Sequence, residues 1–289
     1  MLQSGSAHLT AERINAAPKA LVMGIVNVTP DSFSGDGIAA EAALAQALQM
    51  VADGADMIDI GGESTRPGYI PVAADEEIRR VVPVIASLRA TSTIPISIDT
   101  TKATVAAAAL RAGATLVNDV TALQGDPAMA SLIAASNASV ILMHNRSAVQ
   151  QVIPIPQGGA SYIAPDYRDF MAEVCQDLRT ITATALAAGI AADHIILDPG
   201  IGFGKSAAQN IALIRHCDRI ATLGYPVLLG PSRKSFIGQT LNLPVAERDE
   251  ATCAACIIGW QHGAKISRVH NVRAARRALD MAVAISAAP

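Results

Sequence analysis

Eight short apolar runs recur along this chain, and nearly every one ends in, or is followed by, a polar residue that a purely structural strand would not need. The runs cover residues 21–28, 57–60, 94–98, 115–117, 139–143, 194–197, 226–229 and 265–269. The polar residues at their ends are Asn27, Asp59, Asp99, Asn118, Asp119, His144, Asp198, Ser232, Lys234, Arg268 and His270. If the runs are parallel strands of a closed barrel, these side chains gather at one mouth, the face where barrel enzymes place their catalytic residues.

Segments with helical spacing alternate with the apolar runs from one end of the chain to the other. They cover residues 39–53, 74–90, 102–112, 126–136, 166–188, 208–222, 247–262 and 272–285. This alternation predicts parallel β/α units, and eight units favour a single (β/α)8 TIM barrel with its active site at the C-terminal ends of the strands. A doubly wound open sheet is the alternative. We expect residues 1–18 to form an N-terminal extension and residues 19–289 to form the barrel domain.

The composition argues against several classes of protein. Of the 289 residues, 51% are hydrophobic and only 3% are aromatic, and the formal net charge is −3. Nucleic-acid binding usually needs stacking aromatic rings and a basic surface, so we expect no nucleic-acid partner. The four cysteines are few for this length and favour a reducing compartment. The N-terminal residues do not resemble a signal peptide and the apolar runs are too short to span a membrane, so we expect a cytoplasmic protein.

Two short motifs suggest functions that their context does not support. Cys253 and Cys256 form a C-x-x-C pattern inside an Ala-rich helical stretch without a second Cys or His pair at zinc spacing. We therefore interpret both as buried helix residues rather than as a redox or metal site. The sequence DPGIGFGKS at residues 198–206 ends like a phosphate-binding loop, but Pro199 stands where that loop requires glycine. We expect its glycines to let the backbone approach a flat ligand instead.

The polar strand ends indicate an acidic part and a basic part of one site. Asp99, Asn118 and Asp198 directly follow apolar strand residues. Buried carboxylates at a barrel mouth need hydrogen-bond donors, and a heterocycle with amidine-like N–H groups supplies two to one carboxylate. Asp99 taken alone could instead be a helix N-cap. Cations and a hydroxyl on other predicted loops suit a phosphorylated substrate. These residues are Thr65, Arg66, Lys234, Arg268 and His270.

Eight sequence motifs resemble, in order, those of the dihydropteroate synthases, a family of pterin-binding enzymes. They are MGIVNVTPDSFSGDG (23–37), DIGGESTRPG (59–68), SIDTTK (97–102), VNDV (117–120), LMH (142–144), LDPGIGFGK (197–205), SRKSFIG (232–238) and RVHNV (268–272). The resemblance implies a TIM barrel that condenses 6-hydroxymethyl-7,8-dihydropterin diphosphate with p-aminobenzoate. The products are diphosphate and 7,8-dihydropteroate, a folate precursor. It also implies Mg²⁺ as cofactor and places the chain in a family that is a target of sulfonamides.

Carried over position by position, the resemblance implies a role for each matching residue. The pterin ring would be surrounded by Asp99, Asn118, Asp198 and Lys234. Arg268 would lie against the ring and, with His270, face the diphosphate, whose Mg²⁺ would meet Asn27. A mobile loop would include Thr65, Arg66 and Pro67, and the p-aminobenzoate site would be bordered by Phe203, Lys234 and Ser235. No residue of this set needs to act as a covalent nucleophile.

The chain departs from the family pattern at two places. Asn145, Arg146 and Ser147 follow His144 where many members carry a Met-Gln-Gly type of sequence, and Asn271 stands where Asp is common. Neither departure replaces a residue assigned above. Both concern the rim of the pterin pocket and the long loop 145–165. This loop and the segments 29–37 and 61–71 could fold over a ligand.

Two other functions are open at this point. A pterin-dependent methyltransferase shares the DPG motif and the Asp and Asn strand ends, but SRKSF and NVTPDSF argue against it. A pterin-binding paralogue without activity would lack a cation or carboxylate of the set, and none is missing. Finally, the Ala-rich segment 247–285 could supply an apolar face for a homodimer.

Overall fold

The computed structural model describes residues 9–28, 36–64, 71–147, 152–158 and 160–288, except for the side chains of residues 36–39. Eight parallel strands form its central sheet: β1 (Leu21–Asn27), β2 (Met57–Gly61), β3 (Ile96–Asp99), β4 (Leu116–Asp119), β5 (Ser139–Met143), β8 (Ile195–Asp198), β9 (Leu228–Leu229) and β10 (Ile266–Val269). They pair in the order β8-β5-β4-β3-β2-β1-β10-β9. A parallel bridge between Leu197 and Val227 joins the two end strands. The sheet therefore closes, which confirms the predicted (β/α)8 barrel.

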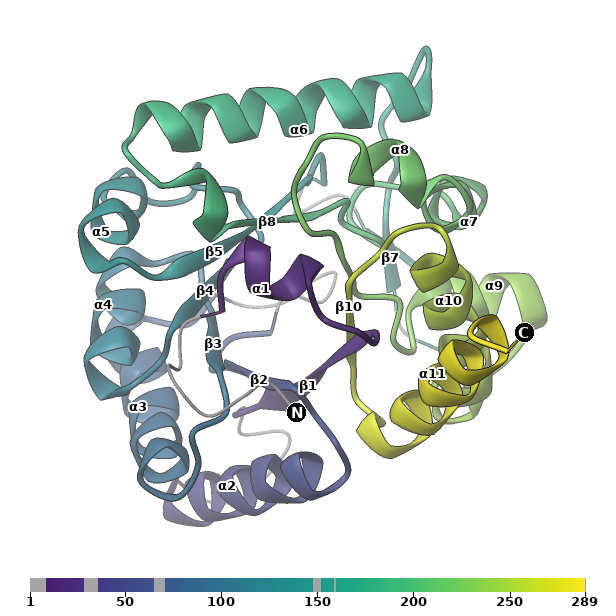
Figure 1. Cartoon of the computed structure of the whole chain (residues 1–289). Helices are drawn as coiled ribbons and strands as arrows, with labels where there is room; N and C mark the ends of the chain where they lie inside the picture. Colours follow the sequence, from purple (N-terminus) through teal and green to yellow (C-terminus); the bar gives the residue numbers. More distant parts are fainter. Residues whose placement is uncertain (1–8, 29–35, 65–70, 148–151, 159, 289) are drawn as a thin grey trace.

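Helices surround the sheet in the expected alternation (Figure 1). They are α2 (Asp36–Ala52), α3 (Ala74–Thr91), α4 (Ala103–Ala112), α5 (Met129–Ser136), α6 (Phe170–Ala187), α7 (Ala207–Arg215), α8 (Cys217–Ala221), α9 (Ser235–Leu241), α10 (Asp249–Gln261) and α11 (Val272–Ser286), with short 3-10 turns at Ala192–His194 and Val245–Glu247. Gly113 ends α4 in the left-handed conformation, with φ of 114°, which glycine adopts without a Cβ clash. No described helix is long and apolar enough to cross a lipid bilayer.

The interior of the barrel is filled by a layer of large apolar side chains at the end opposite the mouth. Strand residues such as Met23, Met57 and Ile196 are fully buried there. Leu9 and Ile14 belong to the same cluster, because the short helix α1 (Ala11–Asn15) packs under the barrel. The domain boundary at residue 19 stays a prediction, although these two earlier residues complete the barrel's own core.

Three elements were not expected from the sequence. The segment 208–222 was predicted as one helix, but it divides at His216 into α7 and α8. Apolar residues continue in register across the break, so their spacing could not reveal it. Helix α9 begins directly at Ser235. The long loop after β5 contains an antiparallel hairpin of β6 (Val152–Pro154) and β7 (Ala160–Tyr162).

The cysteines of the C-x-x-C pattern lie in α10, as predicted. Cys256 is fully buried and Cys253 is partly buried, and all four cysteines of the chain are free. Within the described parts of the chain, no group of three or more His, Cys, Asp or Glu side chains could hold a metal ion. The pattern is therefore part of the packing between helix and barrel.

Candidate active site

Most of the predicted site residues meet at the carboxyl ends of the barrel strands. Asp59, Asp99 and Asn118 come from the ends of three neighbouring strands, β2, β3 and β4, where Asp99 pairs in register with both Gly61 and Asn118. Asp198 ends β8, and Arg268 is the second-last residue of β10. The apolar layer below supports them, and the fold thus brings polar groups from five strands to one end of the barrel.

Arg268 crosses the mouth and joins two buried carboxylates. Its Nε donates to Asp59 Oδ2 at 2.6 Å and its Nη2 donates to Asp99 Oδ2 at 2.7 Å. Asn118 Nδ2 donates to the same Asp59 oxygen at 3.1 Å. Burial alone would lower the arginine pKa, but the carboxylates of Asp59 and Asp99 hold it above its usual value. The guanidinium is therefore fixed and charged at the centre of the mouth.

Burial raises the pKa of Asp99 to about 7, against the opposing charge of Arg268 and with further increases from Asp59 and Glu77. Its Oδ1 is buried and has no hydrogen-bond partner among the residues that the structure describes. The second oxygen of Asp59, Oδ1, is in the same condition. Buried polar atoms normally have partners. These two oxygens are thus available to donors of a ligand.

Asp198 and Lys234 form a second pair of oppositely charged groups at the mouth, and each affects the pKa of the other. Burial raises the pKa of Asp198 and the charge of Lys234 opposes the shift. Conversely, burial lowers the pKa of Lys234 to about 8, and Asp198 opposes that shift. Asp198 Oδ1 accepts the backbone N–H of Gly200 at 2.7 Å, and Lys234 Nζ donates to the carbonyl of Ile201. The loop after β8 therefore anchors both groups.

Phe203 lies beside Lys234 on this loop. The lysine nitrogen is 4.8 Å from the centre of the ring, a cation–π distance. Ser235 follows as the first residue of α9. The predicted trio of Phe203, Lys234 and Ser235 is thus assembled from two adjacent loops of the barrel.

His270 follows β10, and its ring is oriented by Ser232. Ser232 Oγ lies 2.9 Å from His270 Nδ1 and accepts the His270 backbone N–H at 3.1 Å. Asn27 ends β1 and is half-buried. Thr65, Arg66 and Pro67 lie outside the described residues, so their predicted place at the mouth stays a prediction.

Two of the polar residues at strand ends, Asp119 and His144, stabilise the fold and are not part of the group at the mouth. Asp119 accepts the backbone N–H groups of Thr121 and Leu123 at 2.8 Å each, and so shapes the turn after β4. His144 Nε2 lies 3.0 Å from Asp177 of α6, and burial lowers the histidine pKa to about 3. Alternation along a strand sends successive side chains to opposite faces, which separates Asp119 from Asn118.

Sequence reasoning missed four residues that shape the site. Asp59 was noted as a strand end without an assigned role, although it binds Arg268 directly. Lys205 was part of two quoted motifs but was given no role, yet it is 1% exposed and lies close to Asp198. Tyr162 and Asp249 contact site residues from distant elements, Phe203 and Arg233 respectively. Asp59 could have been predicted from its place at the end of an apolar run. The other three residues reach the site only through the fold.

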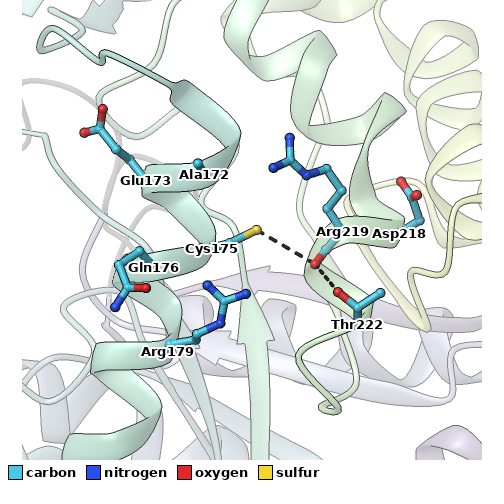
Figure 2. Close-up of a pocket in the computed structure, with 8 residues that line it drawn as sticks. All are labelled: Ala172, Glu173, Cys175, Gln176, Arg179, Asp218, Arg219 and Thr222. Atoms are coloured by element: carbon cyan, nitrogen blue, oxygen red, sulfur yellow. Dashed lines mark hydrogen bonds between the residues drawn. The ribbon is translucent and has the colours of Figure 1, made fainter.

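A hollow of about 540 Å³ lies elsewhere, between α6 and α8 (Figure 2). Its lining includes Arg179 and Arg219, and Cys175 Sγ lies 3.8 Å from the carbonyl oxygen of Arg219. None of the residues at the barrel mouth lines it. We therefore place the chemistry at the strand ends, where the buried charges converge.

Comparison with known proteins shows the family of this chain. The family model described as "Pterin binding enzyme" matches residues 23–270. The dihydropteroate synthase of Bacillus subtilis is 44% identical over 95% of this chain and 91% of its own length. Dihydropteroate synthase of Xanthomonas albilineans with 4-aminobenzoic acid superposes with a TM-score of 0.86 at 41% identity, over 99% of this chain and 100% of that one. The same enzyme in complex with 7,8-dihydropteroate gives a TM-score of 0.82 over 94% and 95% of the two chains, at 41% identity.

A third relative is the Yersinia pestis dihydropteroate synthase in a sulfonamide drug complex. It shares 38% identity with a TM-score of 0.87, over 97% of this chain and 100% of that chain. These similarities extend over nearly the whole chain and include every strand that supplies the mouth. The chain belongs to the pterin-binding enzyme family, among the dihydropteroate synthases.

Proposed function

We propose that the polar groups at the barrel mouth join 6-hydroxymethyl-7,8-dihydropterin diphosphate to p-aminobenzoate, and that they do so by favouring departure of the diphosphate. The C–O bond between the pterin methylene and the diphosphate breaks, a C–N bond to the arylamine forms, and the amine loses a proton. The observation that carries this proposal is the arrangement of buried acids around one fixed guanidinium, with Asp59 and Asp99 both bonded to Arg268.

The acidic groups suit the pterin end of the substrate. A pterin ring presents N–H donors, and the buried Oδ1 atom of Asp99 has no hydrogen-bond partner within the described parts of the chain. Asp198 and Asn118 supply further polar atoms from the ends of β8 and β4. Positive charge develops on the pterin as diphosphate leaves, and fixed carboxylates in a water-poor site stabilise such charge. Asp198 would act as an anchor and Lys234 as a donor to the ring.

The cations suit the other end of the substrate. We assign Arg268 to lie against the pterin ring and, together with His270, to face the diphosphate, where negative charge grows on the leaving oxygens. Thr65, Arg66 and Pro67 would add to this end. Phe203, Lys234 and Ser235 would border the p-aminobenzoate. The arylamine carries its own lone pair, so the attack needs neither a strong general base nor a covalent enzyme intermediate.

The residues at the mouth also fit a magnesium ion carried by the diphosphate. Mg²⁺ prefers oxygen ligands and commonly keeps water and substrate phosphates around one or two protein groups, so it requires no protein cage. The half-buried amide of Asn27 at the end of β1 is a donor of this kind, and we assign it to the ion. When bound, Mg²⁺ would neutralise charge on the leaving diphosphate.

We further propose that the chain works as a cytoplasmic homodimer with its barrel domain at residues 19–289. Four free cysteines suit a reducing compartment. Exposed apolar side chains on the outer helices, Ile258 of α10 with Met281 and Ile285 of α11, supply a face for a second copy.

The reaction is tested by release of diphosphate from purified protein supplied with the pterin diphosphate, Mg²⁺ and p-aminobenzoate. Lys234→Ala and Asp198→Asn should each lower turnover by roughly a hundredfold or more, because each removes a charge from the reacting centre. Matched controls are Lys265→Ala, just before β10, and Asp193→Asn, just before β8, which alter the same residue types at the end of the barrel opposite the mouth. Both controls should keep wild-type rates.

Three results would contradict the proposal. Near-normal turnover in either site variant would remove that residue from the reaction. A protein that transfers methyl groups but releases no diphosphate would favour the methyltransferase, and a folded protein with neither activity would favour the inactive paralogue.

A further inference from the structure

The hairpin in the long loop after β5 packs directly on the wall of the mouth. Tyr162 of β7 is 4% exposed, and its ring stacks on Phe203 with centroids 5.9 Å apart and an angle of 26° between the planes. Val152 pairs with Tyr162 across the hairpin and packs against the same cluster, which also includes Met143 at the end of β5. This cluster is separate from the main core and lies between the hairpin and the barrel.

The far end of the hairpin is fixed to a loop of the active site. Arg248 is 2% exposed, and its Nη2 donates to the carbonyls of Gln157 at 3.0 Å and Gly158 at 3.4 Å. Its Nη1 donates to the carbonyl of Arg233, the residue before Lys234, at 3.0 Å. Gln157 also donates to the side chain of Asn242 at 2.9 Å. One guanidinium thus holds both the hairpin turn and the loop that carries Lys234.

These contacts give Phe203 two fixed neighbours, Lys234 on its own side of the mouth and Tyr162 on the hairpin. An aromatic ring held on a loop can pivot unless other groups pack against it, and offset stacking on a second ring restricts that motion. The position of the Phe203 ring therefore depends on an element that begins about nine residues beyond the end of β5.

We infer that Tyr162 is a positioning residue for the second substrate, and that the β6–β7 hairpin sets the enzyme's affinity and selectivity for para-substituted anilines. The inference rests on the proposed function, in which Phe203 borders the p-aminobenzoate site. By holding the Phe203 ring, the hairpin fixes the width of the slot that accepts the benzene ring of the amine. The pterin end of the mouth contains no hairpin residue among the contacts of Asp99, Asn118 and Arg268 described above, so pterin binding should be independent of it.

Steady-state kinetics of the full chain tests this, with each substrate varied while the other is saturating. Tyr162→Ala should raise the KM for p-aminobenzoate about tenfold, because the arylamine site loses its ordered wall. The kcat and the KM for the pterin diphosphate should stay within about twofold of wild type. The ratio of kcat/KM for p-aminobenzoate to kcat/KM for 4-amino-3-methylbenzoate should decrease, because the slot becomes wider.

Two further variants separate positioning from mere stability. Tyr162→Phe keeps the stacked ring and should restore the wild-type KM. Ile153→Ala removes an apolar side chain from the same hairpin that is 47% exposed, and it should leave all parameters unchanged. If Tyr162→Ala does not fold, Val152→Ala takes its place and should raise the same KM by a smaller factor.

The outcomes distinguish this inference from the proposed function. A wild-type chain that releases no diphosphate overturns both. Wild-type turnover together with an unchanged KM for p-aminobenzoate in Tyr162→Ala and Val152→Ala overturns the inference alone. An equal rise in the KM of both substrates, or a Tyr162→Phe variant as impaired as Tyr162→Ala, does the same.

Discussion

Lys205 is a buried lysine that connects two segments beside the site. Its Nζ donates to the carbonyls of Phe203 at 2.8 Å and His144 at 3.2 Å, and so ties the loop after β8 to the end of β5. Burial lowers its pKa to about 7, although the charge of Asp198 opposes the shift. The unfolded chain therefore binds one more proton than the native protein between about pH 7 and the ordinary lysine pKa near 10.5. The contribution of Lys205 to stability rises with pH across this window and is lost as pH falls through about 7.

Replacing Lys205 by Met should remove this dependence. The unfolding free energy of wild type minus that of Lys205→Met should increase between pH 7 and pH 9.5. Its slope is at most roughly 1.4 kcal/mol per pH unit, the value for a single proton. Urea denaturation of wild type and of Lys205→Met at several pH values measures it. A constant difference across the range would mean that Lys205 is not deprotonated in the native protein.

Site residues differed in how far the sequence could predict them. Asp99, Asn118, Asp198 and Arg268 follow or end apolar runs, so strand alternation alone placed them at the mouth. Tyr162 follows no such run and is brought to Phe203 only by the hairpin. Asp249 lies in α10 and binds Arg233 through two contacts of 2.6 and 2.8 Å and Asn271 at 2.9 Å. It joins the loops that carry Lys234 and His270, a long-range relation that spacing along the chain does not express.

At the scale of elements, the barrel strands and their helices were predictable because each has its own apolar pattern and is bounded by glycine or polar residues. Short elements were not. The hairpin strands have three residues each, which is too few for a periodicity, and their pairing depends on contacts with Arg248. Helix α1 has five residues and buries only Ala11 and Ile14. Its stability comes from packing under the barrel rather than from its own sequence.

Helix α1 should therefore contribute to stability without affecting catalysis. Ile14→Ala leaves a cavity in the fully buried layer below the strands and should lower the unfolding free energy by about 2–5 kcal/mol. Glu12→Ala changes the exposed face of the same helix and should cost much less. Denaturant titration measures both, and the KM values of Ile14→Ala should equal those of wild type. A cost below about 0.5 kcal/mol would show that α1 does not seal the barrel.

At the scale of the whole molecule, large apolar side chains are exposed on the last two helices. Met281 and Ile285 of α11 are 61% and 63% exposed, and Ile258 of the adjacent α10 is 43% exposed. The predicted homodimer would cover these side chains. Met281→Glu should shift the protein toward monomer, because a charge would be buried in the contact. Sedimentation velocity measures the change, with Leu186→Glu on α6 as the control that leaves the dimer intact. A wild-type protein that is monomeric at micromolar concentration would refute the dimer.

The closure of the sheet at its last joint connects this architecture with its chemistry. Strand β9 has only two residues, and a single bridge, Leu197 to Val227, joins it to β8. Asp198 stands on one side of that joint and Lys234 follows on the other. A pterin that binds both residues would bridge the joint at which the barrel strands are most weakly paired. Binding of the pterin and closure of the barrel would then be thermodynamically linked, so that each favours the other.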